Sequence, residues 1–138
     1  MKIHHLGIVT TNVDDTLIAL GLAKNSVTEV VEDTNQMNRL HFVFIEENNL
    51  WLELVEPMNE KSSTYKFAKK NVVGLHHIAF ANLNLEGLKV EIYERPQTCF
   101  LGSYEIEVGS FGGKIKTLFA AFNGLLIEFV EKVKKDHC

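Results

Sequence analysis

The sequence has little of several residue types, and each scarcity excludes a class of protein. Its 138 residues include two cysteines, Cys99 and Cys138, which are too few for a disulfide framework. Two prolines, with 46% hydrophobic and 23% charged residues, indicate an ordinary globular domain rather than a disordered chain. No apolar run approaches the roughly 20 residues that span a bilayer, so we expect no membrane partner.

An excess of basic residues is also missing. The chain has 14 Lys and Arg against 18 Asp and Glu, a net charge of -4. A nucleic-acid-binding face needs a basic stripe, so nucleic acid is not expected as a partner. Met1 leads directly into the strand-like Ile3-His4-His5 and leaves no room for a signal peptide, which favours a cytoplasmic protein.

The sequence does contain an internal repeat. Residues 4–9 match residues 76–81 at an offset of 72, and residues 50–56 match residues 125–131 at an offset of 75. Two matches in the same order at nearly the same spacing indicate duplication.

Each half of the repeat predicts the same elements: an opening strand, a short helix and three further strands. Asn12 and Asn84 are typical helix N-caps. Glu47-Asn48-Asn49 and Asn123-Gly124 are hairpin turns, and the second is the stronger signal. The expected elements are strand 3–10, helix 13–20 and strands 27–32, 40–46 and 50–56, then strand 76–82, helix 85–93 and strands 99–108, 114–121 and 125–131.

A linker joins the two halves. Ser62 or Ser63 could cap a helix that turns Tyr65 and Ala68 inward. We therefore predict an α+β domain over 1–138, with module one at 1–58, a linker helix within 59–73 and module two at 74–133, each module ordered βαβββ.

Strand alternation distinguishes the two histidines of each opening strand. His4 and His76 share their faces with bulky residues, which suit packing under a helix. His5 shares its face with Gly7 and Val9, and His77 is flanked in the same way by Ala79 and Ala81. Small neighbours leave room for a metal ion and a ligand, so His5 and His77 are the candidate metal ligands.

Glu53 and Glu128 stand inside apolar strands, where an unpaired carboxylate would cost several kcal/mol. Neither strand supplies a Lys or Arg to that stretch, and a divalent cation would satisfy both groups. Two imidazoles with two carboxylates suit one ion of Co, Ni, Zn, Mn or Fe.

The sequence resembles the vicinal oxygen chelate superfamily, and within it the methylmalonyl-CoA epimerase family. The resemblance is most specific in the central segments 52–63, 66–71 and 74–80, and it extends to the opening strand 3–8 and the final strand 124–131. It implies paired βαβββ modules that form curved mixed sheets around a metal-lined cleft. It also implies His5, Glu53, His77 and Glu128 as metal ligands.

The resemblance further implies a metal-dependent epimerase or isomerase that moves the α-proton of an acyl-CoA-like substrate, and a homodimer. In that chemistry Glu128 would be both ligand and proton carrier. Counting back twelve residues from Glu53 and Glu128 gives His41 and Lys116, and His41 is the candidate for the second proton carrier. The alternatives are a glyoxalase-type lyase, which uses the same ligand types, and a non-catalytic small-molecule-binding protein of the same superfamily.

Overall fold

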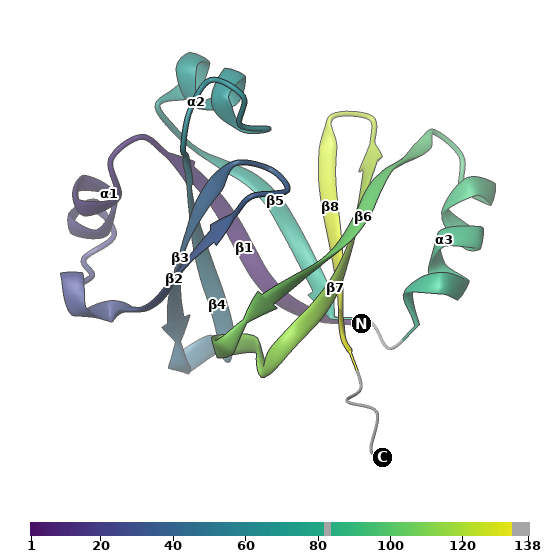
Figure 1. Cartoon of the computed structure of the whole chain (residues 1–138), viewed down its shortest axis with the longest axis horizontal. Coiled ribbons are helices and arrows are strands. Elements are labelled where there is room, and N and C mark those ends of the chain that lie inside the picture. Colours follow the sequence, from purple (N-terminus) through teal and green to yellow (C-terminus); the bar gives the residue numbers. More distant parts are fainter. Residues whose placement is uncertain (82–83, 134–138) are drawn as a thin grey trace. The chain divides into compact units, whose positions relative to one another are not determined.

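The computed structural model describes residues 1–81 and 84–133, which form two compact units. The N-terminal unit comprises His5–His76, and the C-terminal unit comprises the residues from His77 onward together with Met1–His4. The elements follow the order β1 (Lys2–Thr10), α1 (Val13–Ala19), β2 (Val27–Asp33), β3 (Asn38–Ile45), β4 (Leu50–Pro57), α2 (Tyr65–Asn71), β5 (Val73–Ala81), α3 (Leu85–Glu94), β6 (Thr98–Val108), β7 (Gly113–Phe122) and β8 (Leu125–Lys132) (Figure 1). The predicted α+β class with two βαβββ modules is confirmed.

The N-terminal unit contains a mixed sheet in the order β2-β3-β4-β1. β3 pairs antiparallel with β2 and β4, whereas β1 runs parallel to β4. One face is apolar and packs against α1, where Leu17 contacts a buried cluster with Val43 and Leu54. Because side chains alternate across a strand, Glu53 points to the opposite face from Leu54.

The C-terminal unit repeats this arrangement in the order β5-β8-β7-β6. β5 runs parallel to β8, and the β6–β7 and β7–β8 pairs are antiparallel. α3 lies along one face of this sheet (Figure 1), where Leu88 and Ile92 pack with Leu118 and Phe129. Glu128 therefore points away from α3, since its neighbour Phe129 is in the helix-facing core.

The caps of α1 and α3 and the two predicted hairpin turns are those that the sequence predicts. The Asn12 side chain accepts a hydrogen bond from the Asp15 backbone N–H, and the Asn84 side chain accepts one from Gly87, both at 3.0 Å. Two asparagines adopt the left-handed conformation in the hairpin turns: Asn49 at φ 48 before β4 and Asn123 at φ 53 before β8. Asn tolerates this conformation better than most residues, which explains their places in these turns.

The predicted cap of the linker helix is wrong. Thr64, and neither serine, occupies the N-cap position of α2. Ser62 lies before the helix, where its hydroxyl donates to the Asn38 side chain and accepts from the Thr64 backbone N–H. The Ser62 hydroxyl thus contacts the buried side-chain amide of Asn38, at the start of β3. This is a tertiary contact, which local capping rules do not predict.

Three further predictions concern the ends of elements, cysteine and membrane spans. The predicted end of the second opening strand, position 82, lies outside the described residues, as does Cys138. Cys99 is a free, exposed thiol on β6. Within the part of the chain that the structure describes, no helix is long and apolar enough to cross a bilayer.

Candidate metal centre

His5 and Glu53 form a buried pair in the N-terminal unit. β1 and β4 run side by side with Gly7 opposite Glu53, so His5 reaches the same face of the sheet from two positions earlier. The His5 Nε2 lies 3.3 Å from the Glu53 Oε2. His5 is fully buried and Glu53 is 7% exposed, so the carboxylate has almost no access to water.

His77 and Glu128 form the same pair in the C-terminal unit. Here Ala79 lies opposite Glu128 on the parallel β5–β8 pair, and His77 again stands two residues earlier. The His77 Nε2 lies 3.1 Å from the Glu128 Oε1, and both residues are 5% exposed. The duplication has therefore built one local geometry twice, from a histidine on the opening strand and a glutamate on the closing strand.

Glu128 has an additional hydrogen bond that the sequence does not predict. The Thr117 hydroxyl on β7 donates to the Glu128 Oε2 at 2.6 Å, and Thr117 is buried. Thr117 lies opposite Val130 in the β7–β8 hairpin, and the matching position of the N-terminal hairpin, opposite Val55, holds the apolar Leu40. A threonine in a β-rich segment is too common for sequence alone to mark it.

An aromatic residue stands beside the histidine of this second pair. Phe119 lies directly opposite Glu128 in the β7–β8 hairpin, and its ring meets that of His77 edge-on with centroids 6.1 Å apart. The Tyr104 ring on β6 stacks against Phe119 at the same separation. The His77–Glu128 pair thus has the half-buried ring of Phe119 beside it, and Tyr104 packs on the far side of that ring contact.

His41, the predicted second proton carrier, lies on the wrong face for that role. Phe42 is the residue opposite Glu53, whereas His41 pairs in register with Leu54 and so points to the face that carries α1. The twelve-residue count fails because the two hairpin turns differ in length. The residue opposite the glutamate is eleven positions back in the first hairpin (Phe42) and nine in the second (Phe119).

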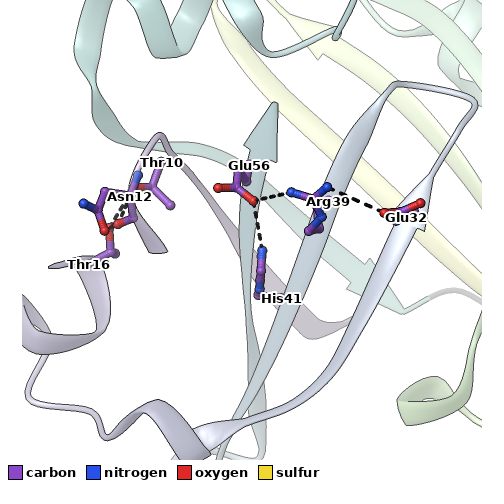
Figure 2. A network of polar contacts seen from close by, with 7 residues as sticks. All are labelled: Thr10, Asn12, Thr16, Glu32, Arg39, His41 and Glu56. Atoms are coloured by element: carbon purple, nitrogen blue, oxygen red, sulfur yellow. Dashed lines mark hydrogen bonds and ion pairs between the residues drawn. The ribbon is translucent and has the colours of Figure 1, made fainter. Parts of the chain in front are cut away.

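His41 belongs instead to a surface ion-pair network (Figure 2). Its Nε2 lies 3.4 Å from the Glu56 Oε1, which also accepts a 3.0 Å hydrogen bond from Arg39. Arg39 in turn lies 3.6 Å from Glu32. The hydrogen bond and charge of Glu56 raise the pKa of the Arg39 guanidinium above its ordinary value, so this cation is permanent. Figure 2 also shows a separate group at the start of α1, in which the Thr10 and Thr16 hydroxyl oxygens lie 2.8 Å apart and each is within hydrogen-bond distance of the Asn12 backbone carbonyl, so the two hydroxyl hydrogens are shared among three contacts.

The chemistry of the two buried pairs fits a divalent cation. Two donors that are each about 2.1 Å from one ion lie about 3.0 Å apart in octahedral and about 3.4 Å apart in tetrahedral coordination. The His–Glu separations of 3.3 and 3.1 Å match this range. They also suit a hydrogen bond between imidazolium and carboxylate. With neutral imidazoles, each pair carries one buried negative charge, which a divalent cation would offset.

The comparisons with known proteins agree with this architecture. No protein-family model matches the sequence. The chain is 30% identical over 141 residues to the mitochondrial methylmalonyl-CoA epimerase of Dictyostelium discoideum, an alignment that covers 95% of this chain and 78% of that protein.

Two solved structures resemble the chain along nearly its whole length. A variant of Streptomyces coelicolor methylmalonyl-CoA epimerase in complex with 2-nitronate-propionyl-CoA is 27% identical, with a TM-score of 0.75, and the match covers 96% of this chain and 95% of that one. A methylmalonyl-CoA epimerase in complex with methylmalonyl-CoA and NH4+ is 26% identical, with a TM-score of 0.75 and coverage of 96% and 94%. The chain belongs to the methylmalonyl-CoA epimerase family, within the vicinal oxygen chelate superfamily.

Proposed function

We propose that this protein is a metal-dependent epimerase that moves the α-proton of methylmalonyl-CoA or a closely related acyl-CoA. In this proposal His5, Glu53, His77 and Glu128 together bind one divalent ion. The observation that carries it is the repeated buried His–Glu pair, built in the same way in both modules of a chain from this family. A relative binds methylmalonyl-CoA, which supports the substrate class.

The four residues have distinct tasks. The two histidines offer Nε2 and the two glutamates offer a carboxylate oxygen, which is a ligand set that suits Co, Ni, Zn, Mn or Fe. When bound, such an ion supplies Lewis-acid stabilisation to the negative charge that the substrate carries after losing its α-proton. The low exposure of these four side chains, at most 7%, supports this chemistry, because charge stabilisation is stronger where water is excluded.

Proton transfer requires an acid and a base, and each module contributes a carboxylate. Glu128 takes the α-proton, and the Thr117 hydroxyl fixes its Oε2 so that the carboxylate cannot rotate. Glu53, the equivalent residue of the first module, enters the step as the protonated acid and gives its proton to the other side of the α-carbon. Exchange with solvent then removes the proton from Glu128 and returns one to Glu53. Two carboxylates in differently bonded surroundings are a common means of separating the acid and base roles, and Thr117 against Leu40 is such a difference.

The test is deuterium incorporation at the α-carbon of methylmalonyl-CoA in D2O, followed by proton NMR. We expect wash-in with protein loaded with Co²⁺ or Mn²⁺, and we expect none with chelator-treated protein. Absence of wash-in with metal-loaded protein would end the epimerase proposal. Turnover of a thiol hemiacetal instead would indicate a glyoxalase-type lyase, and metal binding with neither activity would indicate a binding protein. The expected homodimer stays a prediction, which light scattering would test.

A further inference from the structure

Two aromatic side chains, Trp51 and Phe44, lie beside the His5–Glu53 pair in the N-terminal unit. Trp51 is opposite His5 in the β1–β4 register and two residues before Glu53, so it shares their face of the sheet. Phe44 is opposite Trp51 in the β3–β4 hairpin, and their ring centroids are 4.9 Å apart. Trp51 is half-buried and Phe44 is 37% exposed. This aromatic pair therefore presents apolar surface next to a proposed metal ligand.

The aromatic pair is also on the accessible side of Glu53. The neighbours of Glu53 on this face of β4 are Trp51 and Val55. Val55 is 2% exposed and its cross-strand partner Leu40 is 7% exposed, so packed side chains close that side. In the other direction the β2–β3 pairing stops one residue short of Phe44, which explains the exposure of its ring. A group that extends from Glu53 along this strand therefore meets the aromatic pair.

The second module does not repeat these aromatic residues. Leu126 stands two residues before Glu128, as Trp51 does before Glu53, and Ala121 lies opposite Leu126 in the β7–β8 hairpin. Both modules nevertheless form the same βαβββ sheet and the same buried His–Glu pair. The fold thus forms without aromatic side chains at these two positions, and their presence in the first module calls for a reason other than folding.

We propose that Trp51 and Phe44 bind the substituent on the α-carbon of the acyl-CoA, and that they select an unbranched chain of about three or four carbons over methyl. This inference rests on the proposed function, in which Glu53 gives a proton to the α-carbon. That carbon then lies within hydrogen-bond reach of the Glu53 carboxylate, and its substituent extends over the neighbouring rings.

The length of the chain follows from the exposed area. A phenylalanine side chain has about 200 Å² of surface and a methylene group about 30 Å², so a ring that is 37% exposed offers room for about two methylenes. The half-buried Trp51 adds room for about one or two more. A single methyl group would leave most of this apolar surface in water.

The test uses the fluorescence of Trp51, which is the one tryptophan of the chain. The full-length protein, with Zn²⁺ present, is titrated with methylmalonyl-CoA and with butylmalonyl-CoA. We expect butylmalonyl-CoA to bind about tenfold more tightly, because its three additional methylenes are covered on one side by the rings. Its binding should also shift the Trp51 emission to shorter wavelength as water leaves the indole. Equal Kd values for the two ligands, or an emission that butylmalonyl-CoA leaves unchanged, would overturn the proposal.

Two variants give the first module the residues of the second. Phe44→Ala keeps the Trp51 probe and should reduce the preference for butylmalonyl-CoA from about tenfold to below about threefold, with methylmalonyl-CoA binding changed by less than about twofold. Trp51→Leu, followed by calorimetry, should reduce the same preference. If either variant weakens the binding of both ligands equally, the rings contact the shared CoA arm and the proposal fails.

Phe122→Ala is the matched control. Phe122 is 42% exposed, and strand alternation from Phe119 places it on the face of its sheet away from Glu128. We expect this variant to keep the full preference for butylmalonyl-CoA. A loss as large as that of Phe44→Ala would show a general effect of removing an exposed ring and would refute the assignment.

Deuterium incorporation separates this inference from the proposed function. Incorporation into methylmalonyl-CoA, with no binding preference for the longer chain, would leave the epimerase proposal in place and overturn the role of the aromatic pair. A binding preference that Phe44→Ala removes, without deuterium incorporation into either ligand, would end the epimerase proposal and support the aromatic pair as a binding subsite.

Discussion

Replacing Thr117 by valine tests the proposed role of Glu128 most directly. Valine has nearly the shape of threonine, and Thr117 is only 1% exposed, so the change removes a hydroxyl and leaves the packing of β7 in place. The lost interaction is the 2.6 Å hydrogen bond from the Thr117 hydroxyl to the Glu128 Oε2. This bond fixes the orientation of a carboxylate that, in our proposal, must both bind metal and accept a proton.

The expected magnitude follows from the charge on the acceptor. Hydrogen bonds to charged groups contribute about 1.5 to 3 kcal/mol, and each 1.36 kcal/mol in a barrier is about a tenfold change in rate. If most of the bond's contribution stabilises the transition state, Thr117→Val lowers kcat by about ten- to a hundredfold. KM should change much less, because the hydroxyl acts on the substrate only through Glu128.

The assay is the rate of deuterium incorporation into methylmalonyl-CoA at saturating metal, and Thr117→Ser is the control because it keeps a hydroxyl donor. We expect the serine variant to retain most of the activity. A valine variant with an unchanged kcat would refute the positioning role. So would a serine variant as impaired as the valine variant, since the damage would then come from packing.

Three further predictions follow from the site and the fold. His77→Ala should lose stoichiometric metal in elemental analysis of protein purified without chelators, whereas His41→Ala should keep it; equal loss in both would contradict the proposed ligand set. Val72 has a φ of 62, which a β-branched residue rarely adopts, so Val72→Gly should raise the free energy of unfolding by about 1 kcal/mol in urea titrations despite the entropy cost of glycine. Asn38 is 2% exposed and accepts hydrogen bonds from the hydroxyls of Ser62 and Thr64. Asn38→Ala should therefore lower the free energy of unfolding by about 2 to 4 kcal/mol. A decrease below about 0.5 kcal/mol would show that these hydrogen bonds do not stabilise the linker.

The sequence was most informative where the physical rule is local. Alternation along a strand distinguishes His5 from His4, and the structure shows His5 fully buried beside Glu53. Asparagine chemistry identified both helix caps and both hairpin turns. The duplication then implied that each feature of the first module has a counterpart in the second, and this held for the His77–Glu128 pair.

Partners across a hairpin were decided by tertiary structure alone. Whether His41 or Phe42 faces Glu53 depends on how many residues the turn takes up, and a shift of one residue moves a side chain to the other face of the sheet. The hydrogen bond from Thr117 to Glu128 has the same origin. Residue identity and strand alternation thus set which side chains are available for chemistry. The strand register and the packing of the helices determined which of these side chains meet, because register and packing depend on contacts between segments distant in the chain.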